Sequence, residues 1–161
     1  MKLRDIRHSC SRRSWLFGTT AMSALLGSSI PLNAAGAATK AIVQPASRTG
    51  DSFIRRAFAM RDHAAAAGDR PYGAIVVKAG KIVGEAPSRV VTANDPTAHA
   101  ETEAIRDAAR RLKSRDLAGC ILYSSSRPCL MCEAAAYWAN IERMVHSATA
   151  VDAGPTSLNR C

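Results

Sequence analysis

The pattern of apolar residues changes its period several times between residues 51 and 150, and this alternation restricts the fold more than any other feature of the chain. A helical stripe over residues 51–68 is followed by two β-branched runs, 74–77 and 81–85, around the turn-forming pair Ala79-Gly80. The remaining helix, strand, helix and strand patterns lie at residues 95–112, 120–126, 128–140 and 142–150. Helices that alternate with strands predict an α/β fold, a three-layer α/β/α sandwich with a mixed central sheet.

The first 37 residues depart from this pattern and resemble a bacterial export signal. A basic start with the pair Arg12-Arg13 precedes a mildly apolar run, 15–32, and an A-x-A-like cleavage site lies near Ala35 to Ala37. The residues around the arginine pair resemble the twin-arginine signal. A membrane anchor is the alternative, but a spanning helix needs about 20 strongly apolar residues, and glycine, serine and threonine interrupt this run.

We therefore expect a periplasmic or secreted protein with no stable membrane anchor. Its organisation would be a signal peptide at 1–37, a polar linker at 38–50 and one domain at 51–161. The formal net charge of +9 then falls to +5, because residues 38–161 hold 17 Lys and Arg against 12 Asp and Glu.

One basic cluster lies at the end of a predicted helix and comprises Arg110, Arg111, Lys113 and Arg115. Cations are favourable at a helix carboxyl terminus. Because aromatic residues make up 5% of the chain, the cluster is more typical of a solvated helix end than of a nucleic-acid-binding surface.

Three residues of the types that hold zinc, His99, Cys129 and Cys132, lie near the starts of two predicted helices. Cys129 and Cys132 are three positions apart and share one helix face, and a helix amino terminus favours thiolate over thiol. Three protein ligands and one open position are the composition of a catalytic zinc site, whereas a structural site has four ligands. Taken alone, the C-x-x-C also fits a redox pair or two buried cysteines.

Glu101 follows His99 by two positions, so the two side chains do not share a helix face. A site that uses both must lie in front of the first helical turn, and the pair Asp95-Pro96 predicts a helix start that permits this. Each residue alone has an ordinary explanation, His99 as a core histidine and Glu101 as a first-turn carboxylate stabilised by the helix dipole. Together with Pro128-Cys129-x-x-Cys132, they favour a single catalytic site.

The pattern H-x-E followed by P-C-x-x-C resembles the signature of the zinc-dependent nucleobase and nucleoside deaminases. The resemblance runs from the first predicted helix to about Val151. The segments PYGAIVV, NDPTAHAETEAIR and CILYSSSRPCLMCEAAAYWANIERMVHSATAVDA look most like bacterial guanine deaminases, and tRNA adenosine deaminases share DPTAHAE. The resemblance implies a cytidine deaminase-like fold, a five-stranded sheet between helices, with the site at the amino ends of the second and third helices.

The resemblance also implies a role for each site residue. Zinc on the imidazole and the two thiolates lowers the pKa of a water molecule, and Glu101 carries the proton to a ring nitrogen and then to the departing ammonia. The backbone around Ala100 would hold the exocyclic edge of the base. Further substrate contacts are expected at Ser88, Asn94 and Ser126.

Three features depart from the family pattern. Ser88 stands where relatives commonly carry an asparagine, and Arg127 stands where they usually carry a glutamate before P-C. The chain also ends 29 residues beyond Cys132, whereas guanine deaminases look longer. We therefore expect the fifth strand to be missing and the open edge of the fourth strand to be covered in a homodimer.

These observations predict a zinc-dependent hydrolytic deaminase of a purine base, with guanine as the first choice and xanthine and ammonia as products. Its partner would be a small nucleobase or nucleoside and not a nucleic acid, because tRNA is cytosolic and the signal indicates export. Two alternatives stay open: a deaminase that converts adenosine in tRNA to inosine, and a truncated, inactive paralogue that still binds zinc.

Overall fold

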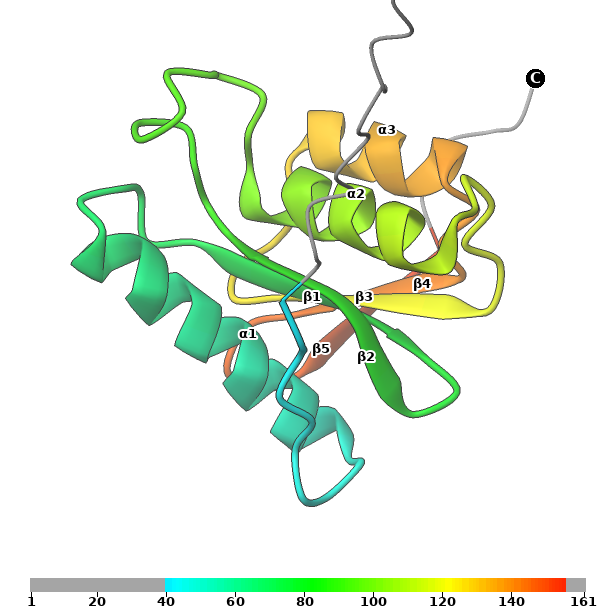
Figure 1. Cartoon of the computed structure of the whole chain (residues 1–161). Coiled ribbons are helices and arrows are strands. Elements are labelled where there is room, and N and C mark those ends of the chain that lie inside the picture. Colours follow the sequence, from blue (N-terminus) through cyan, green and yellow to red (C-terminus); the bar gives the residue numbers. More distant parts are fainter. Residues whose placement is uncertain (1–39, 156–161) are drawn as a thin grey trace, which may run out of the picture. The chain divides into compact units, whose positions relative to one another are not determined.

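The computed structural model of the chain describes residues 40–155, so the export signal expected at 1–37 lies outside the described residues, as do residues 156–161. The described part contains three helices and five strands (Figure 1). In chain order they are α1 (Gly50–Ala66), β1 (Gly73–Lys78), β2 (Lys81–Pro87), α2 (Ala100–Leu112), β3 (Cys120–Ser124), α3 (Leu130–Trp138), β4 (Arg143–His146) and β5 (Val151–Gly154).

The five strands form one mixed sheet in the order β2-β1-β3-β4-β5. β1 runs antiparallel to both β2 and β3, β3 and β4 are parallel, and β5 runs antiparallel to β4. The α/β class and the mixed sheet are confirmed. The parallel pair encloses α3, because parallel neighbours need a crossover connection.

The prediction that the fifth strand is missing is wrong. Residues 151–154 form β5, which pairs with β4 through Val145 and Asp152 and through His146 and Val151. The first three residues of β5 are exposed, so neither face of the strand is buried in the core; the strand is held by main-chain pairing with β4 and by an ion pair between Arg143 and Asp152. Sequence periodicity gives no signal for such a strand. β5, and not β4, is therefore an edge of the sheet.

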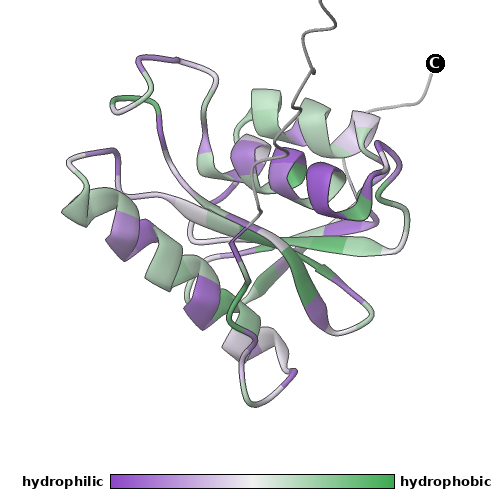
Figure 2. Cartoon of the chain, viewed as in Figure 1, coloured by the Kyte–Doolittle hydropathy of each residue, from purple (hydrophilic) through white to green (hydrophobic). Residues whose placement is uncertain are grey.

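Helices cover both faces of the sheet, with α1 on one face and α2 and α3 on the other (Figure 1). The alternation in β1 divides the core, because Ala74 and Val76 pack with the α2 and α3 side while Ile75 and Val77 pack with the α1 side. Figure 2 shows the central strands as mostly hydrophobic, whereas α2 alternates between hydrophobic and hydrophilic segments. The sheet is thus the buried middle layer of the predicted sandwich.

A glycine in β2 sets how closely α2 approaches the sheet. A Cβ atom on Gly84 would lie 2.6 Å from the carbonyl oxygen of Ala104 and 2.6 Å from the backbone nitrogen of Ala108. Only a residue without a side chain permits this helix–strand contact. The position of α2, and so of the residues at its amino end, depends on it.

The start of α2 differs from the prediction. Asp95-Pro96 does not open the helix, because the Asp95 carboxylate accepts hydrogen bonds from the backbone and hydroxyl of Thr97 and closes a turn. The helix begins at Ala100, and His99 is its N-cap residue. α3 likewise begins at Leu130 with Cys129 as its N-cap residue. Both helix starts lie closer to the candidate ligands than the sequence indicated.

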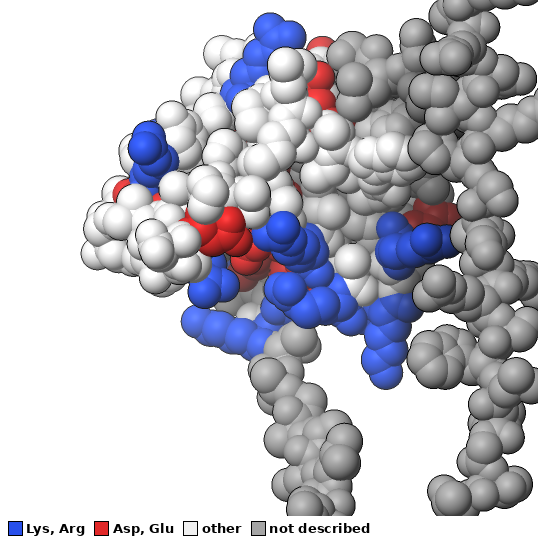
Figure 3. Space-filling view, turned by 90° about the horizontal axis from the view of Figure 1, so that it is seen from above, with Lys and Arg blue, Asp and Glu red and all other residues white. Residues whose placement is uncertain are grey.

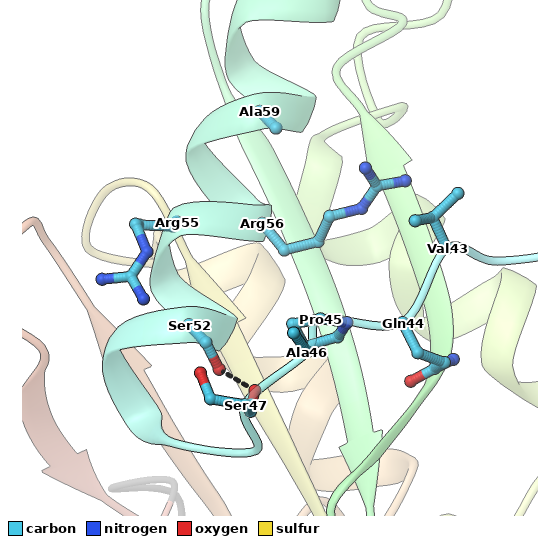
Figure 4. Close-up of a pocket in the computed structure, with 9 residues that line it drawn as sticks. All are labelled: Val43, Gln44, Pro45, Ala46, Ser47, Ser52, Arg55, Arg56 and Ala59. Carbon is cyan, nitrogen blue, oxygen red and sulfur yellow. Dashed lines mark hydrogen bonds between the residues drawn. The ribbon is translucent and has the colours of Figure 1, made fainter.

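The linker predicted at 38–50 has no helix or strand in residues 40–49, yet it is bonded to the domain. The Gln44 side-chain amide donates to the Ile82 carbonyl at 2.8 Å and accepts from the Ile82 backbone nitrogen at 2.9 Å. These bonds occupy the outer edge of β2, where backbone groups lack a strand partner. The segment then passes a hollow beside α1, where the Ser52 hydroxyl donates to the Ser47 carbonyl (Figure 4).

No helix within residues 40–155 has both the length and the apolar character needed to cross a lipid bilayer.

Candidate metal and active site

The amino ends of α2 and α3 bring the three predicted zinc ligands together. His99 Nδ1 lies 3.7 Å from Cys129 Sγ and 3.6 Å from Cys132 Sγ, and the two sulfur atoms are 3.6 Å apart. His99 and Cys129 are the N-cap residues of their helices, and neither side chain caps its own helix by a hydrogen bond. All three ligand atoms are therefore directed to one common point.

The donor set and its spacing fit zinc. A tetrahedral ion with Zn–S distances of about 2.3 Å and a Zn–N distance of about 2.0–2.1 Å separates its ligand atoms by roughly 3.5–3.8 Å. The three observed separations lie inside this range. One imidazole and two sulfur donors also match the ligand types of catalytic zinc sites that keep a fourth position for water.

Cys132 is fully buried, and its surroundings act against the thiolate form that the helix amino terminus favours. Burial raises the pKa of its thiol, and the nearby Glu101 carboxylate raises it further. A bound divalent cation would offset this effect by stabilising the thiolate form. His99 Nδ1, which lies 3.7 Å from Cys129 Sγ and 3.6 Å from Cys132 Sγ, favours a metal site over the redox pair that the C-x-x-C also permitted.

Glu101 lies beside the ligands in the first turn of α2, with only 4% of its surface exposed. Its Oε2 is 3.6 Å from Cys132 Sγ, and its Oε1 accepts a 2.9 Å hydrogen bond from the Ser124 hydroxyl. Ser124, at the end of β3, is itself fully buried. Sequence reasoning did not identify this serine, because a hydroxyl at the end of a strand belongs to no motif.

A cavity of about 630 Å³ opens at the metal ligands. This volume lies within the range of about 300–1,000 Å³ that is usual for small-molecule sites. Besides His99, Glu101 and Cys129, its walls are formed by Arg70, Tyr72, Ser88, Val90, Pro96, Ser126 and Arg127.

Two of the four predicted substrate contacts line this cavity. Ser88 and Ser126 belong to its wall, whereas Asn94 and Ala100 are not among the lining residues. Asn94 is exposed in a turn, with a backbone φ of 50° and its backbone nitrogen bonded to the Val91 carbonyl. Ala100 is fully buried at the start of α2.

One wall of the cavity is held by a buried carboxylate that sequence reasoning did not find. Asp69 accepts hydrogen bonds from the Ser88 hydroxyl and from the backbone and hydroxyl of Thr92, and also from the backbone nitrogens of Arg70 and Val91. Burial on its own would raise the pKa of Asp69, but these donors outweigh it and hold the pKa well below its usual range. Asp69 thus fixes the segment that carries Ser88 and Val90.

A family model described as the cytidine and deoxycytidylate deaminase zinc-binding region matches residues 47–148. This range covers more than half of the chain and includes His99, Glu101, Cys129 and Cys132. The chain belongs to this family. The zinc cofactor inferred from the ligand geometry agrees with it.

Known relatives include proteins with two different named activities. The chain is 43% identical over 110 residues to the guanine deaminase of Bacillus subtilis. The matched region covers 68% of this chain and 70% of that protein. It is also 43% identical over 96 residues to the tRNA-specific adenosine deaminase of Aquifex aeolicus. This match covers 60% of this chain and 64% of that protein. Both relatives thus extend beyond the matched region.

The fold agrees with a solved relative. The X-ray structure of guanine deaminase from Bacillus subtilis superposes with a TM-score of 0.60 at 42% identity, over 62% of this chain and 64% of that one. The cytidine deaminase-like architecture is confirmed by this match. It does not distinguish between substrates, because the tRNA-specific relative has a similar identity.

Proposed function

We propose that the chain is a zinc-dependent hydrolase that removes an exocyclic amino group from a purine, with guanine as the first candidate. One observation carries this proposal: a three-ligand metal site and a buried carboxylate meet in the same cavity, with Glu101 Oε2 3.6 Å from Cys132 Sγ. A binding or structural zinc protein has no need for a carboxylate held beside the metal ligands but outside the ligand set.

The chain's own residues would divide the work as follows. When bound, zinc supplies a Lewis acid that lowers the pKa of a water molecule toward neutrality. Glu101 takes one proton from the water and delivers it to a ring nitrogen; it then takes the remaining hydroxyl proton of the adduct and delivers it to the amino group, which leaves as ammonia. Oxygen adds to the carbon that carries the amino group and the C–N bond breaks, so guanine and water become xanthine and ammonia. Ser124 holds Glu101 Oε1 and leaves Oε2 beside the metal ligands.

Guanine is favoured by the relationship to a guanine deaminase over more than two thirds of both chains. Adenosine in tRNA is the second candidate, because a tRNA-specific relative is equally identical over its shorter match. The proposed export signal and the scarcity of aromatic residues favour a small molecule over RNA.

Ammonia release from guanine, adenosine, cytosine, cytidine and a tRNA anticodon stem-loop tests this proposal. The zinc-loaded full chain should act on guanine, and Glu101→Gln should lower kcat by at least about a hundredfold, the usual scale of general acid–base catalysis. Turnover confined to the stem-loop would favour the second candidate. A zinc-loaded chain that releases no ammonia from any of these compounds, or from the corresponding nucleoside monophosphates, would instead indicate the inactive paralogue.

We also propose that the chain is exported through the twin-arginine signal at 1–37. That pathway accepts folded proteins, which suits a metal enzyme loaded before transport. Amino-terminal sequencing of the exported protein should give a start near Ala38. A start at Met1 in cytosolic fractions alone would contradict export.

We also propose that the chain forms a homodimer, and we base this on exposed apolar residues of α3 and not on an open edge of β4. The edge of β4 is covered by β5, but α3 exposes 78% of Leu130 and 75% of Trp138, eight positions apart on the helix. Exposed large apolar side chains on one element favour a protein interface. Light scattering should give twice the chain mass, and Trp138→Glu should shift the mass to that of a monomer.

A further inference from the structure

We propose that Arg70 and Arg127 bind a phosphate group on the substrate, so that the preferred substrate is a purine nucleoside monophosphate and not the free base. This inference rests on the proposed deaminase function and refines it. The ring and its amino group would occupy the metal end of the cavity, and the phosphate would lie at the two guanidinium groups.

Positive and negative side chains lie at different ends of the cavity. Its lining contains two arginines, Arg70 and Arg127, and one carboxylate, Glu101. Glu101 lies at the buried end, where its two oxygens face Ser124 and Cys132, whereas both arginines are exposed. Zinc on two thiolates adds no net charge. The open part of the cavity is therefore positive.

Neither arginine forms an ion pair with a carboxylate within residues 40–155. Seven other arginines in this part of the chain do form such pairs: Arg56, Arg61, Arg89, Arg106, Arg110, Arg111 and Arg143. Two guanidinium groups in one cavity without a neutralising partner favour an anionic ligand. The guanidinium group is suited to phosphate, because its fork of N–H donors binds two oxygens at once.

The backbone holds both arginines in place. Arg70 follows the buried Asp69, to which its backbone nitrogen donates at 2.7 Å, and Pro71 comes next. Arg127 precedes the buried Pro128 and the metal ligand Cys129. Each guanidinium group therefore extends from a fixed point of the cavity wall, which lowers the entropy cost of binding.

The cavity also favours one nucleotide over a nucleic acid strand. Tyr72 is the one aromatic side chain among the lining residues, so it offers a stacking surface for a single base. Arg89 and Arg106 are both paired with Glu103, so neither offers a free guanidinium group to a nucleic acid backbone. Figure 3 likewise shows acidic side chains beside several of the basic ones on the upper face of the molecule. The two unpaired arginines suit one phosphate.

The test compares guanine, guanosine and guanosine 5′-monophosphate as substrates of the zinc-loaded full chain. The phosphate should raise kcat/KM by about ten- to a hundredfold over guanosine, the usual size of charge-assisted hydrogen bonds. The double variant Arg70→Gln/Arg127→Gln should lose that gain, so that its kcat/KM values for guanosine 5′-monophosphate and guanosine become equal within about threefold. Arg55→Gln is the matched control, since Arg55 is exposed on α1 outside this cavity.

Calorimetric binding of the reaction products separates this inference from the proposed function. Xanthosine 5′-monophosphate should bind more tightly than xanthosine, and the double variant should abolish the difference. Tighter binding without ammonia release would support the phosphate site and count against the deaminase function. Guanine turnover with no effect of the phosphate, or of either arginine, would overturn the phosphate site and leave the deaminase function standing. A strong preference for an oligoribonucleotide over the mononucleotide would also overturn it.

Discussion

Glu101 depends on a neighbour that no motif indicates. Its Oε1 is held by Ser124, whose hydroxyl is fully buried and 2.9 Å away, while its Oε2 faces Cys132. A carboxylate that must accept and return a proton needs a defined orientation, since geometry limits proton transfer as strongly as acidity does. At the scale of single residues, the Ser124 hydroxyl therefore contributes to catalysis by orienting Glu101, and the size of the Ser124 side chain is of less importance.

A pair of variants at Ser124 separates hydroxyl from volume. Threonine keeps the hydroxyl and valine replaces it with a methyl group of similar shape, so both add the same bulk at this buried position. We expect Ser124→Val to have a kcat about ten- to a hundredfold below that of Ser124→Thr, the size of a lost hydrogen bond to a charged group. KM and zinc content should be equal in the two variants. Equal kcat values would show that Ser124 only fills space.

The ionised Asp69 carboxylate should make the free energy of unfolding depend on pH. Its folded-state pKa lies below the ordinary value of 3.8, so its contribution to folding is complete above that pH and is lost as the pH falls below it. Asp69→Asn should therefore lower the free energy of unfolding at neutral pH, with a gap to the wild type that narrows in acid. Urea unfolding measured at several pH values between about 3 and 7 gives this difference. A gap that stays constant with pH would argue against a charged Asp69 in the fold.

At the scale of elements, the site is made by two helix starts that face one point. The residue types at the starts of α2 and α3 indicated a metal site, and the structure places their ligand atoms within 4.8 Å of one another. The exact helix starts were not predictable from Asp95-Pro96, because the Asp95 side chain serves a turn to Thr97 instead. The fifth strand was missed because it is four residues long and its first three residues are exposed, which leaves too short a pattern to indicate a strand.

The contact of α2 with β2 at Gly84 yields a stability prediction for these elements. Gly84→Ala places a methyl group 2.6 Å from the backbone of α2, and forcing the helix away should destabilise the fold by about 1–3 kcal/mol. Gly50→Ala is the matched control: its added methyl group meets nothing within 4 Å, so stability should stay unchanged or rise by up to about 1 kcal/mol. Thermal or urea unfolding of both variants measures the contrast. Equal stabilities would mean that the helix approaches β2 less closely than described.

At the scale of the whole molecule, the sheet brings together helices and strands that lie far apart in the sequence. The alternating pattern was enough to predict the sandwich, because each face of the sheet is covered by helices with their own apolar stripes. The ligands and Glu101 were predictable from residue type and spacing. Asp69, Ser124 and the pairing of Gln44 with Ile82 were not, because these bonds join loops and strand ends that carry no periodic pattern. Such contacts shape the wall of the cavity and therefore affect which substrate the cavity accepts.

The zinc content of the purified full chain tests the central claim most directly. Native mass spectrometry after reconstitution with zinc should find one ion per chain in the wild type and in Glu101→Gln, and none in Cys129→Ala or His99→Ala, because removal of one of three ligands leaves too few to hold the ion. Zinc retained by Cys129→Ala and His99→Ala, or lost from Glu101→Gln, would contradict the assignment of ligands and proton carrier on which the account rests.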